Sequence, residues 1–276
     1  MSAPQSERVS VPPVPTAVHP ARRPGYRVRR YLRQVSAEQR VYWRNGASAF
    51  FTFFLPILFV VFLGLFGRDR IVDGRPYADF FVPGMLGLAV VMTTFAGLAI
   101  TLVIRRERGM LKRVRGTPLP PIVYLGALVT STAIVLALEA VVVLFLGDVA
   151  FGVPLPSHWY EVVLLVALGA ACFAGLGIAV TRFVPNAEGS SAVVNAIYLP
   201  VLLLSGAFFP VHGLPDFLQW FADALPLTHL LDAMRSVFIH GGVGRDELEG
   251  LLVVVLWGVG GAIVALRTFR WEPFGG

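Results

Sequence analysis

Six long runs of apolar residues dominate the chain, and each is continuously apolar instead of alternating with polar positions. A helix rises about 1.5 Å per residue and the hydrocarbon core of a bilayer is about 30 Å thick, so about 20 apolar residues are needed to cross it. Continuous runs favour helices over the alternating strands of a membrane barrel. We therefore predict an all-α integral membrane protein with six transmembrane helices, near residues 50–66, 80–104, 122–146, 159–180, 191–209 and 251–266.

Composition leaves little chain for a soluble domain. Hydrophobic residues make up 56% of the 276 residues, so we assign residues 47–276 to one six-helix transmembrane domain. Residues 1–25 contain six prolines and few large apolar side chains, and we expect them to form a disordered cytoplasmic tail. This tail differs from a secretory signal, because the first apolar run starts only near Phe50 and is long enough to span.

Lysine and arginine are distributed unevenly between the connections. Of the 23, nine precede the first run and six lie between the second and third; Arg182, Arg267 and Arg270 bring this side to eighteen. Cationic connections stay in the cytoplasm. Both termini are therefore predicted to be cytoplasmic, and the pI near 10 is explained by topology and not by a nucleic-acid partner.

Residues 26–46 show an amphipathic pattern. The apolar positions that share roughly one helical face are Val28, Leu32, Val35 and Tyr42. The other faces carry arginines, including Arg33, Arg40 and Arg44. We predict a helix lying on the inner leaflet. The alternative is that these arginines only enforce orientation and bind anionic lipid.

The most basic connection, residues 105–119, separates the second and third apolar runs. It holds six of the lysine and arginine residues, and we interpret it as a docking surface on the cytoplasmic side. The residues that we assign to this surface are Arg105, Arg106, Glu107, Arg108, Gly109, Leu111, Lys112, Arg113, Thr117 and Pro118.

Prolines cut the segment that follows the fifth run into short pieces. The residues that mark its turns and helix starts are Ser205, Gly206, Pro210, Pro215, Pro226 and Arg235. Each piece is amphipathic and too short to span, and broken helices at membrane depth persist only when protein or a cavity surrounds them. We predict a re-entrant cap on the outer face. The alternative is an ordinary surface loop with interfacial helices.

The sequence contains no recognisable catalytic or metal-binding constellation. Its single lysine, Lys112, follows Met110 and Leu111 and not a glycine-rich loop, so this polypeptide is not a P-loop ATPase. Zinc and nucleophile-elbow motifs are absent, and the five histidines are scattered. Cys172 is the only cysteine, which excludes a disulfide framework within the chain. We predict no catalytic residue, no metal and no cofactor on this chain.

Two polar residues fall inside predicted spans, where polar groups usually face protein or water. Glu139 in the third span either lines a pathway or is a neutral carboxyl hydrogen-bonded between helices. Asn195 in the fifth is a second candidate pathway group, or an interhelical hydrogen-bond partner. The positions that we expect to allow close helix packing are Gly84, Gly87, Gly175, Gly177, Gly258, Gly260 and Gly261.

The basic connection and the proline-cut segment together resemble the permease subunits of the ABC-2 transporter family. In that family the first region reads like E-x-G-T-L-E followed by T-P-L, and this chain has Glu107, Gly109, Leu111 and then residues 117–119. The later motifs S-G-x-x-x-P, L-P, L-P-L-T and D-A-x-R are matched by Ser205, Gly206, Pro210, Leu214, Pro215, Leu225, Pro226, Leu227, Thr228, Asp232, Ala233 and Arg235. Met110 and Lys112 depart from the first motif. The chain looks most like the daunorubicin-type drug-resistance exporters.

This resemblance implies a half-transporter of a bacterial cell membrane. Two permease copies, most simply a homodimer, would form the pathway, and two copies of a separate ATP-binding subunit would carry ATP and Mg. Residues 26–44 and 105–119 would be the elbow and coupling helices that receive ATP-driven closure. The cargo would be an amphipathic or hydrophobic drug, antibiotic or lipid.

Two alternatives remain open at this level. One is an ion-coupled secondary transporter without an ATPase, driven by protons through Glu139, although such carriers more often show inverted repeats with paired broken helices. The other is an ABC exporter of a polysaccharide or glycolipid.

Overall fold

The computed structural model describes residues 24–67, 71–72, 74–117 and 119–272. The predicted disordered tail lies outside these residues except for its last two positions, which begin the first helix, and Pro118 lies outside them as well. The first two helices are α1 (Pro24–Arg44) and α2 (Gly46–Phe66), and a short antiparallel hairpin follows, made of β1 (Ile71–Val72) and β2 (Arg75–Pro76).

One continuous helical segment then runs through α3 (Tyr77–Val90), the π-helix η1 (Val91–Gly97) and α4 (Leu98–Glu107). The remaining elements are α5 (Met110–Arg115), α6 (Pro121–Phe151), α7 (Trp159–Val180), α8 (Ser190–Leu204), the 3-10 turn η2 (Val211–Gly213), α9 (Asp216–Asp223), α10 (Pro226–His240) and α11 (Arg245–Thr268).

Five helical segments of the described chain are long and apolar enough to cross a membrane: α2, the α3–η1–α4 segment, α6, α7 and α11. The sixth predicted span is shorter than expected, because α8 has 15 residues and ends at Leu204, not at 209. Ser205 turns its hydroxyl back to donate to the carbonyl of Val201, and Gly206 has a φ of 79°, which only glycine adopts readily. The apolar residues after Gly206 extend the hydrophobic run but not the helix.

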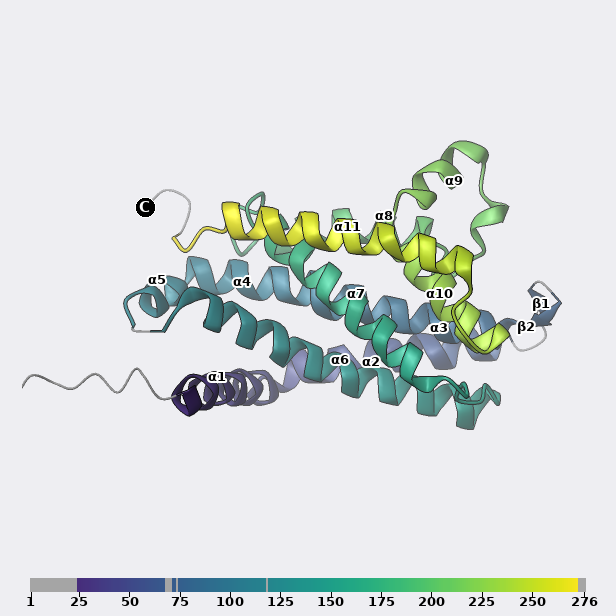
Figure 1. Cartoon of the computed structure of the whole chain (residues 1–276), viewed down its shortest axis with the longest axis horizontal. Helices are drawn as coiled ribbons and strands as arrows, with labels where there is room; N and C mark the ends of the chain where they lie inside the picture. The colour runs from purple at the N-terminus through teal and green to yellow at the C-terminus, as the bar shows by residue number, and fades with distance from the viewer. Residues whose placement is uncertain (1–23, 68–70, 73, 118, 273–276) are drawn as a thin grey trace, which may run out of the picture.

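The connections gather at the two ends of the bundle. Figure 1 shows α1, α5 and the C-terminal end of α11 at one end, which we call the α5 end, and β1, β2 and α9 at the opposite end, the α9 end. The predicted basic connection therefore lies at the same end as the start of α1 and the end of α11. This shared end is the arrangement that an even number of membrane crossings would produce.

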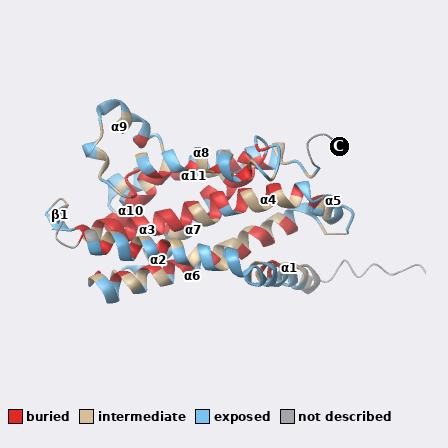
Figure 2. Ribbon diagram, turned by 180° about the vertical axis from the view of Figure 1, so that it is seen from behind, coloured by how far each residue is buried: buried red, intermediate tan, exposed pale blue. Residues whose placement is uncertain are grey.

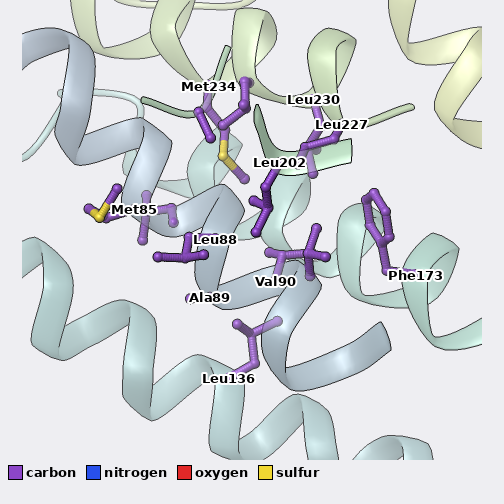
Figure 3. Packing of buried hydrophobic residues seen from close by; sticks show 14 of the residues in the cluster. Met85, Leu88, Ala89, Val90, Leu136, Phe173, Leu202, Leu227, Leu230 and Met234 are labelled. Atoms are coloured by element: carbon purple, nitrogen blue, oxygen red, sulfur yellow. The ribbon is translucent and has the colours of Figure 1, made fainter. Parts of the chain in front are cut away.

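The core surrounds α3. Met85, Leu88 and Val90 are at most 2% exposed, and Figure 3 shows them among side chains from α6, α7, α8 and α10. The labelled neighbours are Leu136, Phe173, Leu202, Leu227, Leu230 and Met234. Figure 2 shows the same distribution, with buried residues along α3 and α7 and exposed ones along α1 and α9. The second predicted span is thus the central helix of the fold.

The proline-cut segment divides into two parts that behave differently. Figure 1 shows α9 projecting from the bundle, whereas α10 returns into it, where it packs against α3, α7 and α11. Leu227, Leu231 and Met234 on α10 have no exposed surface. An ordinary surface loop with interfacial helices therefore describes α9 but not α10, which is part of the core.

Glycine allows the close approach of α3 to the turn after α8. A Cβ atom at residue 84 would collide with the backbone carbonyl oxygen of Ala207. Because backbone cannot move aside as a flexible side chain can, this position requires glycine. The prediction of close packing is confirmed at Gly84.

We expect Gly84→Ala to lower the thermal stability of the purified protein by about 1–3 kcal/mol, because the added methyl group overpacks a backbone contact. Gly126→Ala in α6 is the matched control, since its Cβ would lie 3.5 Å from the ring of Tyr31, an ordinary contact distance. Unfolding in detergent, followed by intrinsic fluorescence, measures both. Equal stability of the two variants would contradict the proposed contact.

Candidate functional site

The first charged residues of the basic connection point into the protein instead of toward solvent. Arg106 is only 2% exposed; its guanidinium donates to the carbonyl oxygen of Thr181 at 2.8 Å and to that of Val184. These carbonyls belong to the turn after α7, where the helix no longer uses them. Arg106 therefore joins the end of α4 to the end of α7.

Arg105 and Glu107 make two further links from the same turn of α4. The Arg105 guanidinium lies 2.7 Å from the carboxylate of Glu38 on α1 and donates to the hydroxyl of Tyr124 on α6 at 2.8 Å. The carboxylate of Glu107 accepts from the backbone N–H of Ala187, just before α8. We call Arg105, Arg106 and Glu107 the α4 hub, because they connect α4 to α1, α6, α7 and α8.

The direction of the chain changes at Gly109, whose φ is 67°. This left-handed residue separates α4 from α5, and Leu111 then anchors α5, with no exposed surface, in a second apolar cluster with Leu98 and Leu102. The polar residues of α5 and its borders are exposed and consist of Arg108, Lys112, Arg113, Arg115 and Thr117. The predicted docking residues thus separate into an inward hub and an outward basic surface.

Helix α1 packs on α6 mainly through polar groups. The hydroxyl of Tyr31 donates to the carbonyl of Gly126 at 3.1 Å, and the Gln39 amide donates to the carbonyl and hydroxyl of Ser131 at 2.7 and 3.0 Å. Val35 and Glu38 are buried on the same side. The predicted apolar face is therefore divided.

The residues of that predicted face follow two different directions. Val35 and Tyr42 face the protein, whereas Val28 and Leu32 are exposed. The predicted arginines Arg33, Arg40 and Arg44 are also exposed. Polar pairing with α6, which leaves no periodic signal, decided this orientation, and it leaves a mixed apolar and cationic surface on the outside of α1.

Glu139 is held by the π-helix. Its carboxylate is 1% exposed and accepts from the hydroxyl of Thr93 in η1 at 2.6 Å. This is the interhelical hydrogen bond that one of the two interpretations of Glu139 required. Asn195 is half-buried on α8 and makes no hydrogen bond within the part of the chain that the structure describes. Its predicted interhelical bond is therefore missing, and the structure does not join it to Glu139.

Arg235 organises the α9 end. Its guanidinium lies 3.8 Å from the centre of the Phe80 ring, donates to the carbonyl of Gly206 and lies 3.5 Å from the carboxylate of Asp232. The predicted prolines serve as helix starts: Pro210 precedes η2, Pro215 precedes α9, and Pro226 is in the first turn of α10. The cap residues therefore fix the turn between α8 and α10 against α3.

The partners that complete these contacts were not predicted. Glu38, Tyr124 and Thr93 carry no motif, and Thr181 and Val184 contribute only backbone oxygens. Each lies tens of residues from its partner along the chain. A polar residue within an apolar run, as at Thr93, is the one signal that could have been noticed.

Comparison with known proteins adds independent information. Residues 32–239 match the family model described as ABC-2 type transporter. The chain is 28% identical over 200 residues to YvfS of Bacillus subtilis, named a transport permease, covering 71% of this chain and 80% of that protein. It is 26% identical over 228 residues to the inner membrane transport permease YadH of Escherichia coli K12, covering 79% and 83%. It is also 28% identical over 194 residues to nodulation protein J of Sinorhizobium fredii, covering 67% and 72%.

We expect the buried pair of Glu38 and Arg105 to be strongly coupled. Their side chains are only 6% and 12% exposed, so Glu38→Gln or Arg105→Gln alone leaves a buried group without its partner and lowers stability by about 2–4 kcal/mol. The double variant should lose less than the sum of the two, by at least about 1 kcal/mol.

The exposed pair of Arg115 and Glu272 is the matched control for this cycle. Its atoms are 3.7 Å apart and its side chains are 62% and 59% exposed, so its coupling should be close to zero. Thermal unfolding of all eight proteins gives both cycles. Additive losses at Glu38 and Arg105 would show that the hub does not bind α1 through charge.

Proposed function

Because the chain belongs to the ABC-2 type transporter family, we propose that it is the permease subunit of an ATP-driven exporter, with ATP hydrolysis on a separate subunit. The family membership makes the chain a multi-pass membrane transport permease and not an enzyme. The observation that carries the rest of the proposal is the division of the basic connection into an inward hub and an outward cationic surface.

The outward surface is the proposed contact for the ATP-binding subunit. Arg108, Lys112 and Arg113 are exposed around the buried anchor Leu111, so a partner with complementary acidic groups can approach them without disturbing the core. The exposed arginines of α1, among them Arg33 and Arg40, extend this surface at the same end of the molecule. In this proposal α5 is the coupling helix and α1 is the elbow helix.

The α4 hub supports a route for movement. A displacement of α5 acts first on α4, and Arg105, Arg106 and Glu107 carry it to α1, to the end of α7 and to the start of α8. Charge-assisted hydrogen bonds of this kind are short and strong. Closure of two ATP-binding subunits would then move these helices together as rigid bodies.

The pathway is proposed to form between two permease copies, most simply a homodimer. Helices α2 and α8 carry many exposed apolar side chains, including Phe51, Phe62 and Leu203, which suit contact with lipid, a second copy or an amphipathic cargo. A drug, antibiotic or lipid would enter from the α5 end and leave near α9. In this arrangement α8 acts as a sixth, shortened crossing, so that both termini lie in the cytoplasm of a bacterial cell.

The coupling proposal predicts that reversing charge on α5 weakens the complex. We expect Arg108→Glu with Lys112→Glu to lower both retention of the ATP-binding subunit and cargo-stimulated ATP hydrolysis about tenfold, which corresponds to about 1.4 kcal/mol. Arg245→Glu at the opposite end is the control and should change neither.

The experiment is purification from native membranes in mild detergent, followed by mass spectrometry of the retained proteins. An ATP-binding subunit in equal amount, lost in the α5 variant only, would support the proposal. A permease that is always recovered without such a subunit would reject it and favour a secondary carrier.

The topology predicts opposite accessibility of α5 and α9. Cys172 is the only cysteine and is buried, so a Cys172→Ala background allows single labels to be introduced. We expect Arg113→Cys to react with a membrane-impermeant maleimide only in inverted vesicles, and Gln219→Cys only in intact cells. Labelling of both positions from the same side would contradict the six-crossing topology.

A further inference from the structure

A shallow apolar groove runs along the surface between α7 and α11. Its volume is about 430 Å³, and the residues that line it include Leu176 and Ala179 on α7 and Leu256, Trp257, Gly260 and Val264 on α11. From Leu256 to Val264 it follows α11 for about 12 Å at about 1.5 Å per residue. The indole N–H of Trp257 already donates to the carbonyl of Ala224 at 3.0 Å. The groove therefore offers apolar contact and no free indole donor.

Gly260 keeps this groove open. A Cβ atom at Gly258 would lie 3.1 Å from the Cα atom of Cys172, and one at Gly261 would lie 2.9 Å from the backbone nitrogen of Leu176. Those two glycines thus let α11 approach α7, as the sequence predicted. A Cβ atom at Gly260 would have nothing within 4 Å. The expectation of close helix packing is wrong at Gly260, and the missing side chain there leaves space on the surface.

Two arginines lie where the groove reaches the α5 end. Arg182 is in the turn that follows α7, and its backbone N–H bonds to the carbonyl of the groove residue Ala179. Arg267 follows Val264 by three residues, so it lies about one turn beyond it on the same side of α11. Both side chains are exposed, and neither has an ion-pair partner within the described residues. Glu188, in the connection to α8, is the nearest acidic residue along the chain and is also exposed.

We propose that this groove binds one acyl chain of an anionic phospholipid, whose phosphate pairs with Arg182 and Arg267. Apolar surface in the bilayer is covered by acyl chains, and cations at the interface attract anionic headgroups. The groove and the two arginines place both requirements on one line parallel to α11. The site lies in the leaflet at the α5 end, and only the naming of that leaflet as the inner one rests on the proposed topology.

The test is native mass spectrometry of the full chain, purified from membranes with any partner retained and exchanged into detergent with dioleoylphosphatidylglycerol or dioleoylphosphatidylcholine. We expect several-fold more bound phosphatidylglycerol than phosphatidylcholine. Gly260→Leu fills the groove and should remove most of this excess. Val259→Leu is the matched control, because Val259 is on the same helix, half-exposed and outside the groove.

A second variant examines the headgroup without altering the packed helices. Arg182→Gln with Arg267→Gln should reduce phosphatidylglycerol binding to the level of phosphatidylcholine and leave the latter unchanged. Equal binding of the two lipids to the native chain, or unchanged selectivity in both variants, would overturn the proposal. A change of oligomeric state in Gly260→Leu without a change in bound lipid would also overturn it, because the occupant would then be a second copy. The measurement needs neither ATP nor cargo, so its failure is separate from failure of the proposed transport function.

Discussion

The segment from Tyr77 to Glu107 is the element on which the packing of the other helices depends. It contacts α2, α6, α7, α8 and α10, and its apolar side chains have almost no access to the surroundings. A helix enclosed in this way cannot shift without repacking several neighbours at once, since protein interiors are close-packed. It also extends the full length of the bundle, from the turn against which Arg235 is held to the hub that precedes α5. The two ends of the molecule are therefore connected by a rigid core and not by surface loops.

The helical spans could be predicted from sequence because a bilayer requires both length and apolarity, and both are visible in a run of residues. The end of α8 could not, because Ala207 and Phe208 are as apolar as the helix before them and the stop depends on the hydroxyl of Ser205 and the conformation of Gly206. The core position of α10 was also hidden. Its buried face reads as an amphipathic surface helix until α3 and α11 are placed beside it.

The functional region was located from charge, but the direction of its side chains was not. Arginine and glutamate in a cytoplasmic connection are ordinarily solvated, so sequence alone assigned the whole segment to one surface. The inward direction of Arg105, Arg106 and Glu107 depends on Glu38 and on backbone groups near residues 181–187. Such partners are brought together only by folding, whereas the exposed positions of Lys112 and Arg113 followed from composition.

The π-helix in the middle of the central segment has a further consequence for how that segment is wound. Hydrogen bonds between residues five apart hold one more residue in a turn than those of an α-helix, so the winding of the backbone is locally looser between Val91 and Gly97. One residue corresponds to about 100° of rotation around an α-helix. The angular phase of α4, and hence the side on which Arg106 meets α7, is offset from that of α3 by this extra turn. The hydrogen bond from Thr93 to Glu139 lies within the section that sets this phase.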